Sequence, residues 1–408
     1  MNDLKFPYAE DASFITQEVM KKMTQSKNRF TIGIPKENND EEKRLALTPE
    51  AVDMIVEAGH RVVLETGAGL GINYSDTRYS ENGAKIVKDK QTVFESDIIF
   101  KISSPTIEEI KMMKQRATIC SMLQLSDFSK ETILAMMSGK INGIGYELIS
   151  ENDGKYHPVR ASISEIEGAT AISVASELLS NAHGGKGILM GGIPGVSPTE
   201  IVIIGAGVAG TIATRAALSL GASVKVFDND INKLRNIQSA LGRTLFTSIF
   251  QPNVLLNAFR TADVVIGAMR YIDINSSVRY VITEDMIKTM KKGALIIDLR
   301  VSQGGCFETS CFLPKDHPKV FERYGILHYC VPNLSSRVAR TTSMALSNIF
   351  TPFILQLEDM TGGSTGINKP DHALHSGFYM YSGKLVNSYV AGCFNLPSND
   401  IGLFLSAY

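Results

Sequence analysis

One stretch of the chain, residues 187–228, constrains the fold more than any other. It consists of a short apolar run, the glycine pattern GAGVAG at residues 205–210, a helical pattern and a second short apolar run. In a strand–turn–helix–strand unit of this kind, Gly205 permits the tight turn, Gly207 lets the backbone approach a pyrophosphate, and Gly210 lets the helix pack close to the strand. The start of the helix offers unpaired N–H groups and a positive dipole end to the phosphates. The stretch therefore predicts a dinucleotide-binding site.

Asp228 ends the second apolar run, at the spacing expected of the acid that accepts the ribose hydroxyls of a dinucleotide. An acid at this position would also repel a 2′-phosphate, so the sequence favours NAD over NADP. A glycine-rich turn in some other α/β protein is the alternative interpretation. Because a strand precedes the glycines and a helix and an acid follow them in the expected order, an NAD site is favoured over an unrelated glycine-rich turn. The predicted cofactor contacts are Gly205, Gly207, Gly210 and Asp228.

Composition limits the class of protein. The 408 residues are enough for two or three domains, and the net charge of −1 leaves no electrostatic footprint for nucleic acid or a membrane surface. No apolar run is long enough to span a bilayer, and the N-terminus has the pattern of neither a signal nor a transit peptide. The five cysteines form no CxxC pair and no metal-type spacing. We therefore expect a cytoplasmic protein with reduced thiols and no metal site.

Short apolar runs alternate with helical patterns along most of the chain, which favours an α/β fold with parallel sheets. We predict two doubly wound Rossmann-like domains, the first of them discontinuous in sequence. A long helix beginning near Ser164 is expected to lead into the second domain, and a helix over 340–358 to return the chain to the first. The predicted domains are a substrate domain over 1–158 and 338–408, with an N-terminal helical arm over 1–29, and an NAD-binding domain over 159–337.

The predicted strands share a short apolar pattern. They are residues 30–35, 60–67, 96–105, 118–125 and 141–149 in the first domain, and 201–204, 223–228, 262–269, 294–300 and 325–331 in the second. Thr48 followed by Pro49 predicts the start of a helix, with the threonine as its cap and the proline in its first turn. Further helices are expected over 131–140 and near 283–290.

Several motifs together resemble the alanine dehydrogenase family. They are IGIPKE, EKRLALTPEAV, GHRVVLETGAG, KGILMGGIPGVSP, VIIGAGVAG, VFDNDINKLR, DVVIGAM, and DLRVSQGGCFET followed by HYCVPN. The resemblance extends over residues 30–395, and that family shares its fold with the soluble nucleotide-binding part of proton-translocating transhydrogenase. It implies reversible, NAD-dependent oxidative deamination of L-alanine to pyruvate and ammonia. It also implies a homo-oligomer, a hexamer or a dimer, whose ligands are a small amino acid and a 2-oxo acid.

The resemblance assigns Arg44, in the RLALTP motif, to the substrate carboxylate, which a bidentate guanidinium suits in geometry. A surface arginine is the alternative interpretation. Ser103, Gln124 and Ser302 occupy positions where the family has a lysine, a histidine and an aspartate. Glutamine and serine do not exchange protons near neutral pH as histidine does. The polar set that the family uses is therefore altered at three positions.

Lys101 is a candidate replacement for the missing lysine. Strand side chains at i and i+2 lie on the same face, so Lys101 is expected to project to the same side as Ser103. The alternative is a lysine that snorkels at the rim of the sheet. The predicted catalytic set is Arg44, Lys101, Gln124 and Ser302. The resemblance adds Ser164 as a phosphate contact and Asn333 as a contact near the nicotinamide. Further polar candidates are Tyr146, Glu147, His157, Arg160, Asp298 and Arg300.

Three functions stay open on the sequence alone. The first is an NAD-dependent alanine dehydrogenase in which Arg44 holds the carboxylate, and Lys101 or a bound water replaces the missing lysine and histidine. The second is a dehydrogenase or reductase of the same fold that acts on another amino or imino acid, and the substitutions motivate it. The third is a catalytically silent NAD(H)-binding protein. Turnover of alanine, turnover of another acid, and NADH binding without turnover distinguish them.

Overall fold

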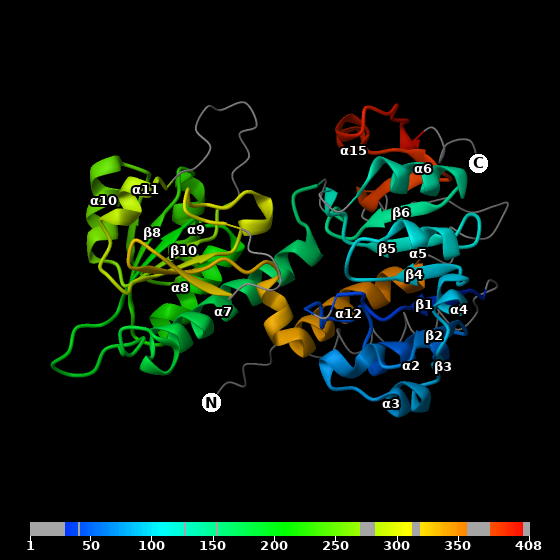
Figure 1. The fold of residues 1–408 in the computed structure, drawn as a ribbon, viewed down its shortest axis with the longest axis horizontal. Coiled ribbons are helices and arrows are strands. Elements are labelled where there is room, and N and C mark those ends of the chain that lie inside the picture. The colour runs from blue at the N-terminus through cyan, green and yellow to red at the C-terminus, as the bar shows by residue number, and fades with distance from the viewer. Residues whose placement is uncertain are drawn as a thin grey trace, which may run out of the picture. The chain divides into compact units, whose positions relative to one another are not determined.

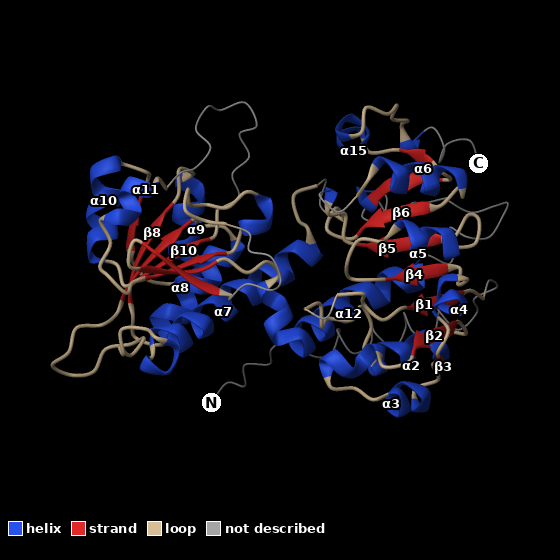
Figure 2. Ribbon diagram, viewed as in Figure 1, coloured by secondary structure: helices blue, strands red, loops and turns tan. Residues whose placement is uncertain are grey.

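The computed structural model describes residues 29–39, 41–125, 128–151, 154–269, 282–311, 319–356 and 376–402. The helical arm predicted over residues 1–29 falls, except for its last residue, outside the described residues. The chain divides into two compact units (Figure 1). Unit 1 consists of residues 1–160 and 339–408, and unit 2 of residues 161–338. Each unit contains one sheet with helices packed on it (Figure 2).

Unit 1 is built on an eight-stranded sheet in the order β3-β2-β1-β4-β5-β6-β14-β15. Strands β1 to β6 pair in parallel, and β14 and β15 extend the β6 edge in antiparallel fashion. The strands are β1 (Thr31–Ile34), β2 (Arg61–Glu65), β3 (Lys85–Val87), β4 (Ile98–Phe100), β5 (Thr118–Ser121), β6 (Asn142–Gly145), β14 (Phe378–Tyr381) and β15 (Lys384–Leu385).

Several helices of unit 1 begin at a side chain that satisfies a free N–H group of the first turn. Ser75, Asp89, Thr106 and Ser129 each accept such a hydrogen bond. The helices are α2 (Pro49–Glu57), η1 (Ala68–Ile72), α3 (Asp76–Glu81), α4 (Lys90–Phe94), α5 (Ile107–Met112), α6 (Lys130–Ser138), α12 (Ala339–Gln356) and α15 (Ser388–Cys393). Helix α12 packs against α2 and η1 and so belongs to unit 1, although it lies late in the sequence.

Unit 2 is built on a seven-stranded sheet in the order β12-β13-β11-β10-β7-β8-β9, parallel except for β12. The strands are β7 (Glu200–Ile204), β8 (Ser223–Phe227), β9 (Phe246–Ser248), β10 (Val264–Gly267), β11 (Leu295–Asp298), β12 (Val320–Arg323) and β13 (Ile326–Tyr329). The helices are α7 (Pro158–Leu179), whose first residues belong to unit 1, η3 (Asn181–His183), α8 (Val208–Ser219), α9 (Ile231–Leu241), α10 (Pro252–Thr261), α11 (Glu284–Lys288), η4 (Val301–Gln303) and η5 (Leu334–Val338).

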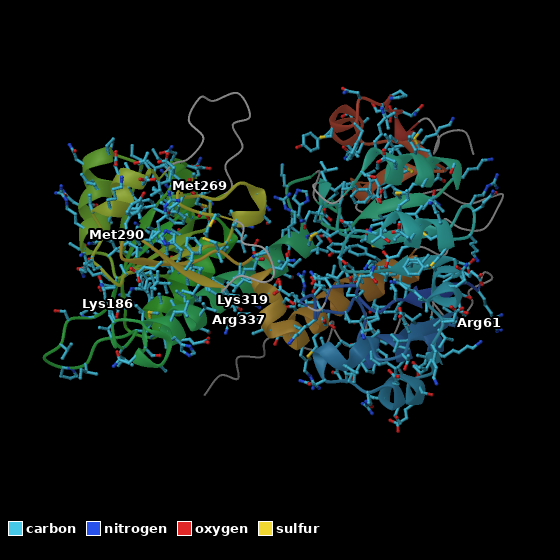
Figure 3. The ribbon with its side chains drawn as sticks, viewed as in Figure 1. Arg61, Lys186, Met269, Met290, Lys319 and Arg337 are labelled. Carbon is cyan, nitrogen blue, oxygen red and sulfur yellow. The ribbon has the colours of Figure 1, made fainter. Side chains whose placement is uncertain are left out.

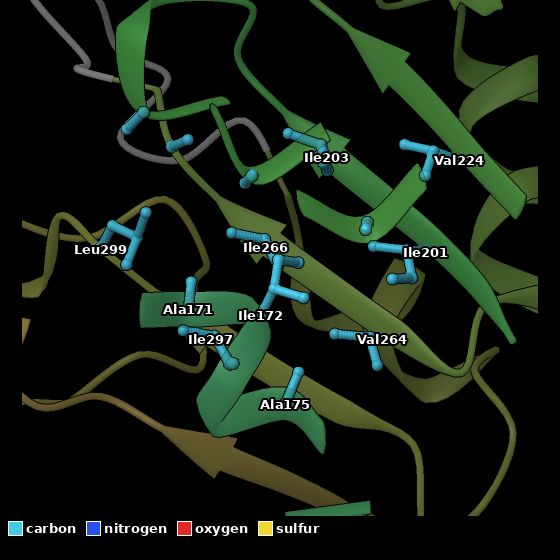
Figure 4. Close-up of a cluster of buried hydrophobic side chains, with 14 of the residues drawn as sticks. Ala171, Ile172, Ala175, Ile201, Ile203, Val224, Val264, Ile266, Ile297 and Leu299 are labelled. Atoms are coloured by element: carbon cyan, nitrogen blue, oxygen red, sulfur yellow. The ribbon is translucent and has the colours of Figure 1, made fainter. Parts of the chain in front are cut away.

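The sheet of unit 2 is covered on both faces. Ile201 and Ile203 of β7 join one buried apolar cluster, whereas Val202 and Ile204 join another. Figure 4 shows the first cluster, in which Ile172 of α7 lies with apolar side chains of β10 and β11. Burial on both faces explains why the strands of this unit are continuous apolar runs rather than alternating ones. Each such isoleucine contributes about 1.5–3 kcal/mol through the removal of its surface from water.

Each sheet has a point where the strand order reverses. From β1 the chain adds β2 and β3 on one side and then starts β4 on the other, and β7 stands in the same relation to β8, β9 and β10. Ligands of doubly wound proteins bind outside the carboxyl ends of the strands at such points. The predicted α/β class with two doubly wound sheets is confirmed. The residues that follow β1, β4, β7 and β10 are therefore the candidate ligand-binding positions.

Several predicted bounds were wrong. The strand expected over 96–105 ends at Phe100, because the Ile102 N–H donates to the Glu37 carboxylate at 2.7 Å instead of continuing a ladder. The strands expected over 118–125 and 141–149 also end early, at Ser121 and Gly145. The helix expected near Ser164 begins at Pro158, a residue suited to a first helical turn.

The helix predicted after Thr48 is present and begins at Pro49, but the threonine side chain does not cap it. Its hydroxyl instead lies 3.3 Å from the Ser347 hydroxyl of α12. Thr48 is therefore the N-cap residue, as predicted, but the predicted hydrogen bond from its side chain to the first turn is absent. A contact with Ser347 of α12 replaces it.

Candidate functional site

The glycine turn after β7 is fixed by close packing. Gly205 has φ of 109°, in the left-handed region, and a Cβ there would lie 2.8 Å from the Met269 nitrogen. Met269, labelled in Figure 3, follows the carboxyl end of β10. A Cβ at Gly210 would lie 1.8 Å from the Gly205 carbonyl oxygen, whereas one at Gly207 would meet nothing within 4 Å. Two glycines are thus required by the protein itself, and the third leaves open space beside the backbone.

The start of α8 suits an anionic ligand. Its N-cap residue is Gly207, so no side chain caps the helix. Free N–H groups and the positive end of the helix dipole are therefore directed at the space beside the turn. Gly168 of α7 packs against this turn, since a Cβ there would lie 2.3 Å from the Ala209 carbonyl oxygen. These features fit the pyrophosphate of a dinucleotide.

Asp228 follows β8 and is buried against the same turn. One carboxylate oxygen accepts the Ala206 N–H at 2.8 Å, and the other accepts the Asp230 N–H at 2.9 Å. A carboxylate has about four acceptor positions, so these two bonds orient the group without saturating it. About two acceptor positions of the carboxylate remain, and ribose hydroxyls are the groups that the sequence predicts for them.

The other two predicted cofactor residues also belong to unit 2. Ser164 lies half-buried on α7, four residues before Gly168. Asn333 is exposed in the loop after β13, with φ of 55°. Its carbonyl accepts the Ser336 N–H at 2.8 Å, which fixes the turn that holds it. Both positions lie in the unit that contains the glycine turn.

Arg44 is buried in unit 1, with 2% of its surface exposed, so the alternative of a surface arginine is wrong. Its Nε donates to the Glu42 carboxylate at 2.7 Å, and its Nη2 pairs with the same group. The segment that follows is held by α12, because the Leu45 N–H donates to Ser343 Oγ at 2.8 Å and the Thr48 N–H to Ser347 Oγ at 3.0 Å. The guanidinium is therefore fixed in both position and orientation.

Lys101 lies directly after β4 and is 2% exposed, which rules out a lysine that snorkels to the rim. Its Nζ lies 2.7 Å from Glu37 Oε2, 3.0 Å from Ser103 Oγ and 3.7 Å from Glu109 Oε1. The contact with Ser103 confirms that the two side chains project to the same side. The Ser103 hydroxyl in turn donates to Glu37. The amine is therefore enclosed by two carboxylates and a hydroxyl.

The ion pairs continue beyond Lys101. Glu109 accepts a hydrogen bond from the Asn38 amide at 2.7 Å and pairs with Lys90 at 2.8 Å. Burial raises the pKa of Glu109, but the charge of Lys101 and the bonds from Lys90 and the Thr106 N–H outweigh it, so the pKa lies below its usual value. The carboxylate of Glu109 is thus favoured in its ionised form.

Tyr146, after β6, donates its hydroxyl to the Ile102 carbonyl at 2.7 Å. Burial raises its pKa well above the usual value, an effect that the nearby charge of Arg44 only partly offsets. The phenol therefore stays neutral at physiological pH and acts as a hydrogen-bond donor. The charge of Arg44 affects the pKa of Tyr146, and the Tyr146 hydroxyl donates to the residue that follows Lys101. Tyr146 therefore lies close to both predicted residues.

Gln124 and Ser302 lie in different units. Gln124 is half-buried in unit 1, and its backbone N–H donates to Ser104 Oγ at 3.3 Å. Ser302 is exposed in η4 of unit 2. The structure thus gathers Arg44, Lys101 and Gln124 at the carboxyl edge of the first sheet, and the glycine turn, Asp228 and Ser302 at that of the second.

The two acids that pair with Lys101, Glu37 and Glu109, were not predicted from the sequence. Glu37 follows β1 within the IGIPKE motif, so its place at the carboxyl edge of a strand was an available signal. Glu109 closes a capping box with Thr106, a pattern that indicates a helix start but not a pairing with Lys101. The pairing of Lys101 with Glu37 joins residues 64 positions apart, and no local sequence pattern predicts either pairing.

Three of the remaining candidates, His157, Glu147 and Asp298, have partners within the chain. His157 Nδ1 lies 3.2 Å from the Ile149 carbonyl, and Glu147 accepts the Leu123 N–H at 2.7 Å. Asp298, after β11, accepts the Cys306 N–H at 2.8 Å and the Ser310 hydroxyl at 2.5 Å, and burial raises its pKa. Within the described ranges, no three His, Cys, Asp or Glu residues are grouped so as to hold a metal ion.

Two family models match the chain. The N-terminal domain of the alanine dehydrogenase/PNT family matches residues 33–167, and the C-terminal domain of that family matches residues 171–388. The helices of the described part of the chain include none that is long and apolar enough to cross a membrane.

Curated relatives and solved structures agree with these matches. The chain is 35% identical over 370 residues to alanine dehydrogenase of Staphylococcus saprophyticus, covering 91% of this chain and 98% of that protein. It is 34% identical to alanine dehydrogenase of Bacillus subtilis over 88% of this chain and 93% of that one. A solved L-alanine dehydrogenase superposes with a TM-score of 0.81 at 29% identity, covering 90% of this chain and 99% of the other. A transhydrogenase from Sinorhizobium meliloti, at 24% identity and a TM-score of 0.72, shares the fold over 88% of this chain and 99% of its own.

Proposed function

Since the chain belongs to the alanine dehydrogenase/PNT family, we propose that it catalyses the reversible, NAD-dependent oxidative deamination of L-alanine to pyruvate and ammonia. The observation that carries the proposal is 35% identity to an alanine dehydrogenase over 91% of the chain. The buried, carboxylate-braced Arg44 and the open glycine turn supply the two kinds of group that this chemistry requires.

Unit 2 is the proposed NAD-binding domain. The open space at Gly207 and the uncapped start of α8 support pyrophosphate binding, and Asp228 supports binding of the ribose. Because Asp228 would repel a 2′-phosphate, we expect NAD rather than NADP. Ser164 and Asn333 are proposed as further contacts. The nicotinamide of the bound cofactor supplies the acceptor for the hydride that leaves Cα of alanine.

Unit 1 is the proposed substrate domain. Arg44 binds the carboxylate of alanine, and Glu42 keeps the guanidinium in one orientation. The Ser103 hydroxyl accepts from Lys101 and donates to Glu37, which leaves it an acceptor position for the substrate ammonium group. Lys101 thus acts by holding Ser103 and by keeping the site charge-balanced. Gln124 and Ser302 are proposed to supply hydrogen bonds but no titrating group, so protons leave through water.

The test is alanine-dependent NADH formation by the full chain and by Arg44→Lys and Arg44→Ala. Loss of the bidentate contact is expected to lower kcat/KM for alanine by about a hundredfold, mainly through KM. Arg61→Ala is the matched control, because Arg61 is an exposed arginine of the same unit (Figure 3). Unchanged NADH binding in each variant verifies that unit 2 is folded, and an unchanged urea-unfolding transition verifies unit 1. Normal alanine turnover by Arg44→Ala would remove Arg44 from the substrate site.

A second candidate function is the oxidation of another amino acid or the reduction of another imino acid. The observation that favours it is that Ser103 and Gln124, which do not titrate, stand where the family has lysine and histidine, while the amine of Lys101 is enclosed by Glu37, Ser103 and Glu109. Hydride transfer to a preformed imine needs no proton donor at a carbonyl oxygen. A panel of amino, imino and 2-oxo acids with NAD or NADH decides between the two. Tight NADH binding without turnover of any of them would instead indicate a silent NAD(H)-binding protein.

An assembly and a location are also proposed. The family resemblance supports a homo-oligomer, a hexamer or a dimer, which light scattering on the purified chain would measure. All five cysteines are free thiols, which supports a reducing, cytoplasmic location.

A further inference from the structure

One arginine of unit 2 has a buried donor without a partner. Arg300 follows β11 at the carboxyl end of that strand, and its side chain is 17% exposed. Its Nε is buried and has no hydrogen-bond partner in the described part of the chain. Its guanidinium pairs with Glu167 of α7 at 3.8 Å, which is too long for a hydrogen bond. Because a buried donor left unmatched costs free energy, this arrangement indicates an acceptor that comes from a ligand.

The backbone that carries Arg300 is held in place. The Arg300 N–H donates to Asp298 Oδ1 at 2.8 Å, and the Arg300 carbonyl accepts the Gly305 N–H at 3.0 Å. The preceding residue, Leu299, is buried in the apolar cluster that also contains Ala171 of α7 (Figure 4). The unmatched donor therefore belongs to a fixed turn that packs against α7.

The contact with α7 places the guanidinium near the start of α8. Glu167 is followed by Gly168, where a Cβ would lie 2.3 Å from the Ala209 carbonyl oxygen in the first turn of α8. Ser164, which is also proposed as a phosphate contact, precedes Glu167 by three residues and so lies on the same face of α7. Arg300 thus reaches the part of α7 that borders the glycine turn.

A second set of contacts leads from Arg300 to the glycine turn. Burial and the charge of Asp298 raise the pKa of the Cys306 thiol well above its usual value, and the charge of Arg300 partly offsets this, so the two side chains are close. The Cys306 thiol donates to the Met269 carbonyl at 3.1 Å, and a Cβ at Gly205 would lie 2.8 Å from the Met269 nitrogen. Strand β10 alone separates β11 from β7, which is a distance of about 10 Å. Arg300 therefore borders the turn from two directions.

The charges around the turn favour a cation in this position. Each phosphate of a dinucleotide carries a negative charge, and the start of α8 supplies only about half an elementary charge in compensation. Asp228 and Glu167 are both acids, and their contacts lead to the same turn. Arg300 supplies positive charge there. Its planar fork of N–H groups matches the oxygens of a phosphate.

A second arginine of the same unit shows what full pairing looks like. Arg337, labelled in Figure 3, also reaches a glutamate of α7, but it lies 2.7 Å from Glu177 and donates to the Tyr329 hydroxyl at 3.4 Å. Helix α7 can thus pair with an arginine at hydrogen-bond distance. It does so for Arg337 and not for Arg300.

We propose that Arg300 binds the pyrophosphate of NAD(H), with Nε and a terminal nitrogen of the guanidinium donating to phosphate oxygens. This inference rests on the proposed function in one respect, the assignment of unit 2 as the NAD-binding domain, and it involves residues of unit 2 alone. Glu167 keeps the guanidinium beside the turn when the cofactor is absent, and its long pairing distance leaves the donors available. Arg300 is thus a cofactor-binding residue in addition to the glycine turn and Asp228.

The experiment compares two ligands by calorimetric titration of the full chain. They are NADH and ADP-ribose, which has the pyrophosphate but no nicotinamide. Arg300→Gln is expected to weaken the binding of both by about 10- to 100-fold and to the same extent, because charge-assisted hydrogen bonds to the pyrophosphate are lost. Arg300→Lys keeps the charge but not the fork and should weaken both by less. Arg337→Ala is the matched control and should leave both affinities unchanged.

Thermal unfolding separates a binding role from a structural one. Because the Arg300 Nε has no partner and its ion pair is long, ligand-free Arg300→Gln should unfold at the wild-type temperature. Added NADH should raise the unfolding temperature of the wild-type protein more than that of the variant, since a ligand stabilises in proportion to its affinity for the folded state.

Three outcomes would overturn the inference. The first is an unchanged affinity of Arg300→Gln for NADH. The second is weaker binding of NADH with unchanged binding of ADP-ribose, which would assign the guanidinium to the nicotinamide. The third is unfolding of ligand-free Arg300→Gln well below the wild-type temperature, which would assign Arg300 a structural role. Failure of the proposed function is distinguishable, since it appears as binding of both ligands that depends on Arg300 but without oxidation of alanine in the presence of NAD.

Discussion

In unit 1 the carboxyl edge of the sheet carries buried charges that pair with one another, whereas in unit 2 the corresponding edge carries glycines and backbone N–H groups. Arg44 pairs with Glu42, and Lys101 with Glu37 and Glu109. The turn at Gly205 and Gly207 contains no charged residue of its own, and one carboxylate, that of Asp228, accepts the Ala206 N–H within it. The same strand order thus supports two kinds of site. One fixes side chains by ion pairs, and the other leaves space for a ligand beside the main chain.

The ion pairs of unit 1 predict the largest effect. Lys101→Met would leave Glu37 and Glu109 buried without their shared cation, and the free energy of unfolding of the protein is expected to fall by about 3–5 kcal/mol. Lys114→Met is the control, because Lys114 pairs with Asp97 at the surface, where a pair contributes about 1 kcal/mol or less. Urea unfolding followed by circular dichroism measures both. Equal decreases in the free energy of unfolding of the two variants would show that burial does not increase the contribution of Lys101 to stability.

Acid is expected to affect the two units at different pH. His328 of β13 is buried, which lowers its pKa from 6.5 to about 4, so its neutral form stabilises unit 2 above pH 6.5. This stability, about 3 kcal/mol, is lost as the pH falls from 6.5 towards 4. The lowered pKa of Glu109 stabilises unit 1 above its unfolded value of 4.5, and that contribution is lost only as the pH falls further.

Hydrogen exchange read by mass spectrometry would detect the order of the two losses. Protection in unit 2 should decline before protection in unit 1 as the pH is lowered. His328→Gln, which keeps an acceptor and a donor for Thr309 Oγ1 and the Ile326 carbonyl, should flatten the decline in unit 2 alone. Simultaneous loss of protection in both units would contradict the assignment of the two losses to His328 and Glu109 separately.

The glycines of unit 2 predict opposite effects of the same substitution. Gly210→Ala forces a methyl group against the Gly205 carbonyl and is expected to destabilise the protein by about 1–3 kcal/mol. Gly207→Ala meets no protein atom, so stability should be retained while NADH binding weakens. Thermal unfolding and calorimetric titration with NADH measure the two quantities. Tight NADH binding by Gly207→Ala would show that the cofactor does not approach the backbone there.

The smallest expected effect concerns the support of Arg44. Ser343→Ala removes the acceptor of the buried Leu45 N–H and should cost about 1 kcal/mol of stability. Because the preceding residue is Arg44, KM for alanine should rise more than kcat falls. Thr351→Ala on the same helix is the control, since its hydroxyl donates to the Ser347 carbonyl within α12. Equal KM values in the two variants would leave Ser343 without a positioning role.

Local patterns predicted what local interactions decide. The glycine turn and Asp228 lie close in sequence, and the strand–turn–helix order around them follows from short-range sterics, so the fold of unit 2 was predictable. The end of β4 was not, because it depends on Glu37, a residue 65 positions away from Ile102. The pairing of Lys101 with Glu37 has the same long-range origin.

Residue type alone also did not predict the burial or the hydrogen-bond partners of the candidate side chains. Arg44 and Lys101 were identified as polar candidates, but their near-complete burial and their carboxylate partners follow from tertiary packing. The altered positions Ser103, Gln124 and Ser302 could be named from the motif, yet only the structure places Ser103 against Lys101 and leaves Ser302 exposed in the other unit.

The hydroxyls of α12 have a consequence for how the protein is made. The Leu45 N–H finds its acceptor on Ser343, 298 residues later in the chain. While the ribosome is still synthesising unit 2, which is continuous in sequence, the segment of Arg44 has not yet met the helix that holds it. A nascent chain can thus complete its glycine turn well before its arginine is in place, and a transcript cut short before α12 would encode one finished site and one unfinished one.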